Sequence, residues 1–259
     1  GMAGEFSDTL TFDQAHPNAL TNVGFVVGFD ANGTEEWFRR VAGGGEVAMG
    51  ELSWEGDTLW SVGGQAGNNL LFSSPVVAIA SNYPHSAFVL GFTQQGQLLA
   101  QRTIGSDHAI AATHVNARAG QILIGGAFHC QPLELSERFG GDGLLLAWEP
   151  SNAWLALLRA DDQFIQYGQA VVDNAPIELR GVALDQHDRI YAVGEFNGVL
   201  VCPAIEGLVH VVGGDSVFSV APDGLDGACD DSTYYDAITL RSRGERDAFL
   251  LKSFLRDRR

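Results

Sequence analysis

Two acidic turns carry the residues in this sequence that are best suited to bind a metal ion. The first comprises Asp30 and Asn32. The second offers more carboxylates and comprises Asp223, Asp226, Asp230 and Asp231. Calcium prefers several oxygen ligands that converge from a tight turn. Neither segment has the complete calcium-loop pattern with its distal glutamate, and Asp, Asn and Gly are also the residues that hairpin turns require. Calcium sites and metal-free turns therefore both remain open.

Residues for catalysis are harder to find. The sequence contains no G-x-S-x-G, HExxH, P-loop or CxxC motif. Three carboxylates, Glu5, Glu195 and Asp215, hold equivalent places in a repeat described below. Two of them would serve a glycosidase or lyase if they converged to roughly 5–9 Å. A single sequence does not show such convergence, so no catalytic residue is assigned.

The tryptophans are candidates for a carbohydrate surface, because a flat indole face suits a sugar ring. Trp37, Trp60 and Trp148 fall at repeat positions that other large apolar residues share, so we expect them in the core. Trp54 and Trp154 fall outside that pattern. These two are the remaining candidates for a carbohydrate surface, a role that requires exposure.

Composition limits the range of partners. The formal net charge is −17, and such a surface repels phosphate backbones and anionic lipid. The chain has no apolar run long enough for a transmembrane helix. Hydrophobic residues make up 46% and charged residues 18%, which is typical of a packed domain. The 32 glycines and the weak helical periodicity favour many short strands joined by tight turns.

Internal repeats decide the predicted fold. Segments that open with glycine recur at Gly4, Gly64, Gly126 and Gly194. Each leads into about four short strands with apolar alternation, and four antiparallel strands per unit describe a propeller blade. We therefore predict an all-β fold: a β-propeller of about four to five four-stranded antiparallel blades, or a fragment of a larger propeller.

The predicted domain is a single one over residues 4–259, preceded by a tag remnant and lead-in at residues 1–3. Its units lie at about 4–63, 64–125, 126–193 and 194–259. Glycines at the unit boundaries are expected to permit a sharp change of direction and close backbone approach. A hairpin near the C-terminus, up to Phe254, would close the ring if it completed the first blade.

The order of these segments resembles the bacterial β-propeller repeat family often called SBBP repeats, found in secreted and surface proteins. Residues 4–63 and 168–224 carry the resemblance best, the latter with the stretch Ile190-Tyr-Ala-Val-Gly-Glu-Phe196. It implies a propeller fold and an extracellular, periplasmic or cell-surface location, with the signal peptide outside this chain. It also implies a disulfide between Cys202 and Cys229, with free thiols as the alternative. Cys130 has no evident partner. The family motif contains no catalytic residue.

These observations favour a non-enzymatic extracytoplasmic module that binds a protein or a glycan or serves as a structural scaffold. One alternative is a carbohydrate-active enzyme, a glycosidase or lyase that uses carboxylates in the propeller funnel. Another is a stretch of structural repeats in a large surface protein. No cofactor is expected apart from calcium at the acidic turns, and neither nucleic acid nor membrane insertion is expected.

Overall fold

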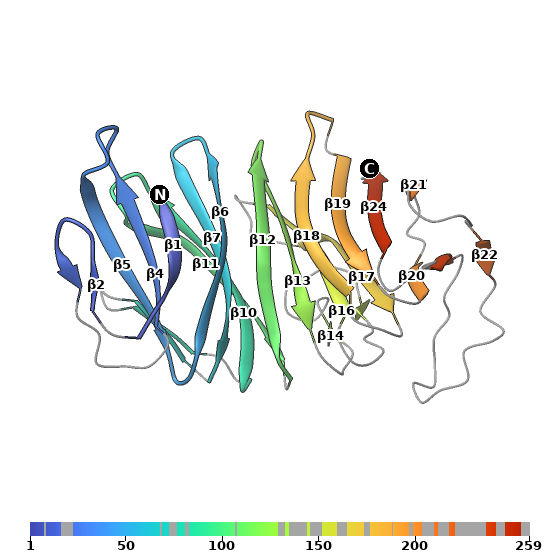
Figure 1. Ribbon diagram of the computed structural model, residues 1–259, viewed down its shortest axis with the longest axis horizontal. Coiled ribbons are helices and arrows are strands. Elements are labelled where there is room, and N and C mark those ends of the chain that lie inside the picture. Colours follow the sequence, from blue (N-terminus) through green and yellow to red (C-terminus); the bar gives the residue numbers. More distant parts are fainter. Residues whose placement is uncertain are drawn as a thin grey trace.

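The computed structural model is all-β, and its strands form antiparallel sheets (Figure 1). The structure describes residues 1–7, 9–16, 23–67, 69–72, 77–80, 83–106, 108–128, 133–134, 144–145, 152–159, 165–173, 177–187, 189–196, 199–203, 210–211, 218–220, 237–241 and 247–254. Within these ranges there is no helix. Consequently, the described part of the chain also has no helix that could cross a bilayer.

Four larger sheets account for most strands. The first has the order β1 (Met2–Phe6), β4 (Val23–Phe29), β5 (Glu35–Gly43), β8 (Asn69–Phe72), β9 (Val77–Ala80). The second has the order β11 (Leu98–Ser106), β10 (His85–Thr93), β7 (Thr58–Ala66), β6 (Val47–Glu55). The third has the order β12 (Ile110–Arg118), β13 (Gln121–Phe128), β16 (Asn152–Arg159), β17 (Ile165–Asp173), β20 (Val199–Pro203), β23 (Ala237–Arg241), β22 (Phe218–Val220).

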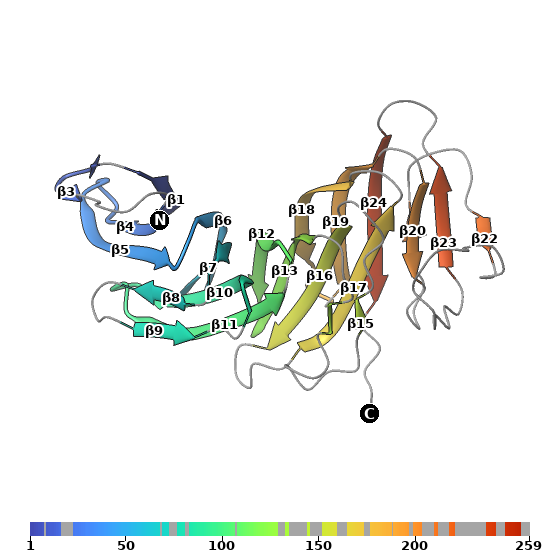
Figure 2. The same cartoon turned by 90° about the horizontal axis from the view of Figure 1, so that it is seen from below.

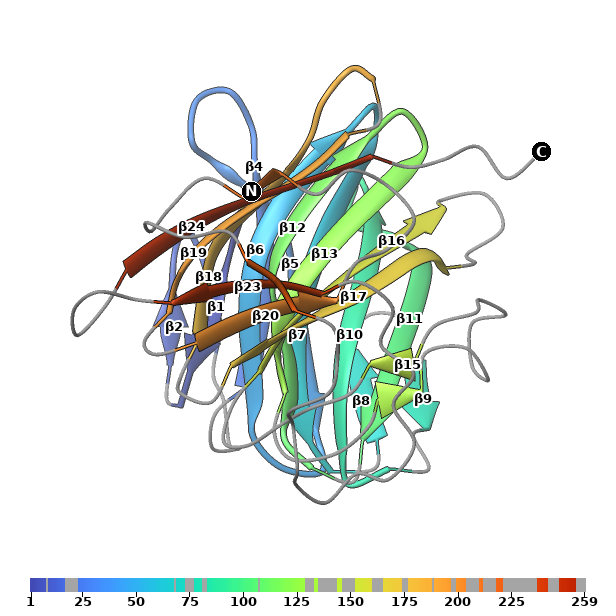
Figure 3. The same ribbon diagram turned by 90° about the vertical axis from the view of Figure 1, so that its right-hand side faces the viewer.

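The fourth sheet has the order β18 (Ile177–Leu184), β19 (Arg189–Phe196), β24 (Asp247–Phe254), β21 (His210–Val211). Two short hairpins complete the described strands: β2 (Leu10–Thr11) with β3 (Ala15–His16), and β14 (Leu133–Glu134) with β15 (Leu144–Leu145). In Figure 2 the first sheet lies at one end of the molecule, and β20, β23 and β22 of the third sheet lie at the other end, beyond β18, β19 and β24 of the fourth. Viewed from the end in Figure 3, the strands of successive sheets overlie one another.

Three hydrophobic cores lie between the four sheets. Consecutive residues of a strand point to opposite faces of its sheet, so a strand in an inner sheet contributes side chains to two cores. In β7, Leu59 enters the core between the first and second sheets, the first core, and Trp60 enters the second core, between the second and third sheets. In β13, Ile122 lies in the second core and Leu123 in the third, between the third and fourth sheets. Both faces of β7 and β13 are therefore apolar and buried, as expected for strands of sheets that must stack.

Side chains on one edge strand satisfy backbone groups of the next. The edge strands β1, β6, β12 and β18 lie side by side. Glu5 Oε1 accepts a hydrogen bond from the Met49 amide (3.1 Å), and Ser53 Oγ accepts one from the Ala117 amide (2.9 Å). Asn116 Oδ1 accepts one from Leu184 (2.9 Å). We call these contacts clasps. They occupy amides that an unprotected edge strand would offer to another chain.

The outer face of the first sheet is covered by the β2–β3 hairpin. The His16 ring stacks on Phe38 with a centroid distance of 3.7 Å, and Phe12 lies 5.8 Å from the Phe25 ring. His16 Nε2 also lies 2.9 Å from a carboxylate oxygen of Glu35. This end of the stack thus buries its aromatic face with its own chain.

The sheets are out of phase with the predicted repeat units. Gly63 and Gly64, at a predicted boundary, both lie inside the extended strand β7, so the predicted change of direction there is wrong. The close approach is confirmed: a Cβ on Gly63 would lie 2.3 Å from the Phe88 ring, and one on Gly64 would lie 2.7 Å from Ala111 Cβ. These glycines are needed where another residue presses against the strand, not where the chain turns.

The strands at both ends of the chain differ from the predicted arrangement. β1 begins at Met2 and pairs Met2 with Val27 and Ala3 with Val26, so the lead-in is part of the first sheet. β24 pairs with β19 and completes the fourth sheet, not the first. The apolar segment at 152–159 is strand β16, in keeping with the weak helical periodicity of the sequence.

Candidate functional site

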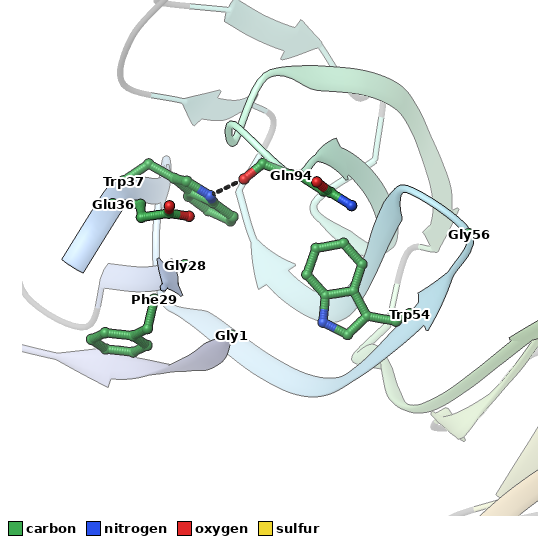
Figure 4. Close-up of a pocket in the computed structure, with 8 residues that line it drawn as sticks. All are labelled: Gly1, Gly28, Phe29, Glu36, Trp37, Trp54, Gly56 and Gln94. Atoms are coloured by element: carbon green, nitrogen blue, oxygen red, sulfur yellow. Dashed lines mark hydrogen bonds between the residues drawn. The ribbon is translucent and has the colours of Figure 1, made fainter. Parts of the chain in front are cut away.

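An open cavity of about 310 Å³ lies where the first and second sheets meet. Its walls are formed by side chains from both sheets and by backbone near Gly1, Gly28 and Gly56. The side chains are those of Phe29, Glu36, Trp37, Trp54 and Gln94 (Figure 4). Its volume falls at the lower end of the range for small-ligand sites. We call this cavity the tryptophan cleft.

Trp37 forms the rear of the cleft and is only 7% exposed. It pairs across the strands with Gly28, and a Cβ at Gly28 or at Gly96 would lie 2.3 Å from its indole. The two glycines thus leave space for the ring. The Trp37 indole N–H donates to the Gln94 carbonyl at 2.7 Å. Trp37 is therefore fixed between its own sheet and the β10–β11 hairpin of the next.

Arg39 holds the same hairpin from a position two residues further along β5. Its Nε donates to the Gly96 carbonyl at 2.6 Å, and its guanidinium carbon lies 5.8 Å from the Trp37 ring centroid. Partial burial lowers the pKa of Arg39 from its ordinary value. The hairpin from Thr93 to Gln97 is thereby docked on the first sheet.

Trp54 forms the opposite side of the cleft and is 46% exposed. Alternation along β6 explains its position: Leu52 packs against the first core, and Ser53 points the other way to clasp Ala117. Trp54 follows at the strand end, one residue before Glu55 and the turn at Gly56, whose φ is +54°. Of the tryptophans whose side chains the structure describes, Trp54 is the exposed one.

The polar side chains of the cleft offer hydrogen-bond acceptors. Glu36 is exposed and carries its carboxylate beside Trp37 (Figure 4). The Gln94 amide nitrogen donates to Asp57 Oδ1 at 2.8 Å, which leaves the amide oxygen for the cleft. A ligand with hydroxyl or N–H donors on its rim and an apolar face would match these walls.

The tryptophan predictions have mixed outcomes. Trp54 is exposed, as a carbohydrate surface requires, and Trp37 and Trp60 are buried, as predicted. Trp154, the other candidate for a carbohydrate surface, is 0% exposed, because its side chain lies in the second core between the second and third sheets. Its indole N–H lies 3.3 Å from the carbonyls of Ala111 and Ala127. Trp148 lies outside the described residues.

At the first acidic turn, the oxygens of Asp30 accept hydrogen bonds from the chain itself. Its Oδ1 accepts from the amides of Asn32 and Thr34, both at 2.8 Å, and its Oδ2 accepts from the Asn32 side chain at 3.3 Å. The hydrogen bond from Thr34 and then those from Asn32 lower the Asp30 pKa. Gly33 in this turn has a φ of +84°. Calcium at Asp30 and Asn32 stays a prediction, alongside the Asx turn described here.

Other predicted site residues are separated or lie outside the described ranges. Asp223, Asp226, Asp230 and Asp231 are outside them, as are Asp215, Cys130 and Cys229. Cys202 lies in β20, whose side chains are not described, so the predicted disulfide with Cys229 stays a prediction. Within the described residues, no group of three His, Cys, Asp or Glu side chains gathers as metal ligands would.

The two candidate carboxylates for glycoside hydrolysis that the structure describes, Glu5 and Glu195, do not converge. Glu5 lies in the first sheet and Glu195 in the fourth, with two sheets between them (Figure 2). Glu5 accepts from the Met49 amide, and Glu195 Oε1 accepts from Arg180 Nε at 3.2 Å. Both carboxylates therefore have structural partners.

Glu36 and Gln94 are site residues that sequence reasoning missed. The only signal was indirect: Gln94 belongs to a turn recognised from Thr93-Gln-Gln-Gly96, and Glu36 precedes a tryptophan at a repeat position. Comparison with protein-family models and with curated proteins gave no match for this chain.

Proposed function

We propose that this chain is a non-enzymatic, extracytoplasmic binding module built from propeller blades, and that it holds a protein or glycan ligand at the tryptophan cleft. The observation that carries this proposal is Trp54, a half-exposed indole that faces a cavity bounded by a carboxylate and an amide. An exposed indole in a concave site keeps apolar surface in contact with water, and a ligand that covers it gains free energy of binding by removing that contact. Aromatic residues of this kind often contribute most of the binding free energy.

The assignment of blades is supported by the way the sheets stack. The second sheet has four antiparallel strands, with β8 and β9 of the first sheet between β7 and β10 in the chain, and the third begins with four more, β12-β13-β16-β17. Each is apolar on both faces and has one edge strand clasped to its neighbours. Four antiparallel strands, two apolar faces and a clasped edge strand are the features that we expect of propeller blades of the SBBP type. The described residues do not form a closed ring, so we propose an open set of blades rather than a complete propeller.

The enzymatic alternative receives less support from this geometry. A glycosidase would need a carboxylate pair on either side of one bond, and Glu5 and Glu195 are separated by two sheets. The cleft itself contains a single carboxylate, Glu36, among its described lining residues. Binding without hydrolysis is therefore the function we propose.

The test is a binding screen of three purified proteins: the wild-type chain, Trp54→Ala and Leu99→Ala. Leu99 is a matched control because it is also a large exposed apolar residue (58% exposed) but does not line the cleft. Each protein is applied to an array of defined glycans and purified extracellular proteins. We expect the wild type and Leu99→Ala to bind the same ligand and Trp54→Ala to lose at least tenfold in affinity. Equal binding by all three, or no binding, would overturn the proposal, and release of a cleaved product would favour an enzyme.

A further inference from the structure

The size of the tryptophan cleft limits what can occupy it. Its volume of about 310 Å³ suits one compact ring with its substituents, since small-ligand sites begin near this size. A stable protein–protein interface buries about 800 Å² on each partner, far more than one exposed indole and its neighbours provide. The cleft therefore fits a small unit at the end of a larger ligand, not a protein surface.

The two indoles of the cleft offer one free face. Both sides of Trp37 are approached by Gly28 and Gly96, and Arg39 already lies over its ring. Trp54 is the indole with a face left for a ligand. An organic cation such as an alkylammonium group gains most when several aromatic faces surround and desolvate it. A pyranose ring, by contrast, presents one flat face of C–H groups and can use a single indole.

The polar groups complete the match with a sugar. The Glu36 carboxylate and the Gln94 amide oxygen are both acceptors, because the Gln94 nitrogen is engaged with Asp57 and the Trp37 N–H with the Gln94 carbonyl. Hydroxyl groups on the rim of a pyranose supply the donors that these oxygens need. A carboxylate or sulfate on the sugar would instead meet Glu36 and a protein of net charge −17, which disfavours anionic sugars.

From these three observations we propose that the tryptophan cleft is a subsite for a single uncharged pyranose residue. The ring stacks on Trp54, and its hydroxyls donate to Glu36 and to the Gln94 amide oxygen. This inference rests on the proposed binding function and narrows it to one ligand class. The subsite contributes a contact for one residue of a longer glycan, and its affinity for a monosaccharide is in the millimolar range.

The test is a titration followed by NMR of the tryptophan indole N–H signals, with the Trp54 signal assigned from its absence in Trp54→Phe. The probes are methyl glycosides of neutral hexoses and of N-acetylhexosamines, a methyl glucuronide, and tetramethylammonium chloride. We expect a neutral glycoside to shift the Trp54 signal with a millimolar Kd. Trp54→Ala should weaken that binding at least tenfold, Glu36→Gln about threefold to tenfold, and Leu99→Ala not at all.

The outcomes separate this inference from the broader proposal. Tighter binding of the glucuronide or of tetramethylammonium would overturn the uncharged-pyranose class and leave the binding module standing. If no probe shifts the Trp54 signal while Trp54→Ala still abolishes binding in the array, the cleft holds a different ligand and this inference falls alone. If both experiments are negative, both proposals fall.

Discussion

Two equivalent boundaries between sheets have opposite characters in this molecule. Gly33 and Gly96 hold the same place in the β4–β5 and β10–β11 turns, 63 positions apart. With the same offset, Trp37 corresponds to Ala100 and Trp54 to Ala117. The boundary with the two tryptophans has the open cavity of about 310 Å³. At the next boundary, Ala117 is buried in the second core and Ala100 packs against it, and a cavity that Ala100 lines there measures about 10 Å³.

The difference shows how a repeat fold gains a site without changing its framework. Alanines at Ala100 and Ala117 let the second and third sheets close to contact, and the second core there is continuous. At the first boundary, Trp37 supports the Thr93–Gln97 hairpin and Trp54 stands on the opposite side. Strand pairing is alike at both boundaries. Side-chain size at two positions therefore distinguishes the boundary with an open cavity from the boundary with a closed core.

The largest expected effect concerns the closed boundary. Trp154 is fully buried in the second core, so Trp154→Ala leaves a cavity and removes its hydrogen bonds. We expect a loss of about 3–5 kcal/mol in the free energy of unfolding. Trp54→Ala, at the open boundary, should change it by less than about 1 kcal/mol. Urea denaturation of both variants measures this contrast, and comparable losses would show that Trp54 is a structural residue, not a free binding surface.

A smaller effect is expected from the glycine that accommodates Trp37. At Gly96, φ is +72°, and a Cβ would lie 2.3 Å from the Trp37 ring. Gly96→Ala should therefore cost about 1–2 kcal/mol for the left-handed backbone and about 1–3 kcal/mol for the clash. Gly33→Ala is the matched control, because Gly33 has a φ of +84° and a Cβ added there would meet no atom within 4 Å.

Gly33→Ala should lower the free energy of unfolding only by the cost of the left-handed backbone. Thermal or urea unfolding of the two variants measures the difference in stability between them. Gly96→Ala should also weaken ligand binding, since it displaces Trp37 and with it Gln94. Equal losses in stability for the two variants would show that the hairpin moves freely away from Trp37. The cleft would then lack the fixed rear wall on which the proposed ligand class depends.

The strands and their stacking could be predicted from local pattern. Phe88-Val-Leu-Gly-Phe92 alternates between two cores, with Phe88 and Leu90 in the first and Val89 in the second. A period of two with apolar residues on both faces requires sheets on either side. The turns were predictable for the same reason, because glycine at Gly33 and Gly96 supplies the positive φ that they require.

The cleft was less predictable, because it depends on contacts between distant segments. Trp37 and Gln94 are 57 residues apart in sequence and meet only when the second sheet packs on the first. Trp154 illustrates the reverse case: it falls outside the repeat pattern, yet its side chain lies in the second core between the second and third sheets. Whether a tryptophan is exposed follows from the sheet packed against it, and a repeat pattern in one chain does not give the spacing between sheets.

The smallest expected effect tests the clasps that hold the closed boundary together. The Ala117 amide donates to Ser53 Oγ at 2.9 Å, so Ser53→Ala leaves this edge amide without that acceptor. A typical hydrogen bond contributes about 0.5–1.5 kcal/mol, and we expect a loss of that size in the free energy of unfolding. Amide hydrogen exchange should be faster at Ala117 and unchanged at Leu184, which Asn116 clasps independently.

Asn116→Ala provides the reciprocal control, because it should speed exchange at Leu184 and leave Ala117 protected. Each clasp joins two sheets, so exchange that stays local to the altered amide would mean that the boundary remains closed and only one edge group is freed. Faster exchange at both amides in either variant would contradict independent clasps. It would mean instead that the boundary between the second and third sheets and the boundary between the third and fourth sheets open together as one unit.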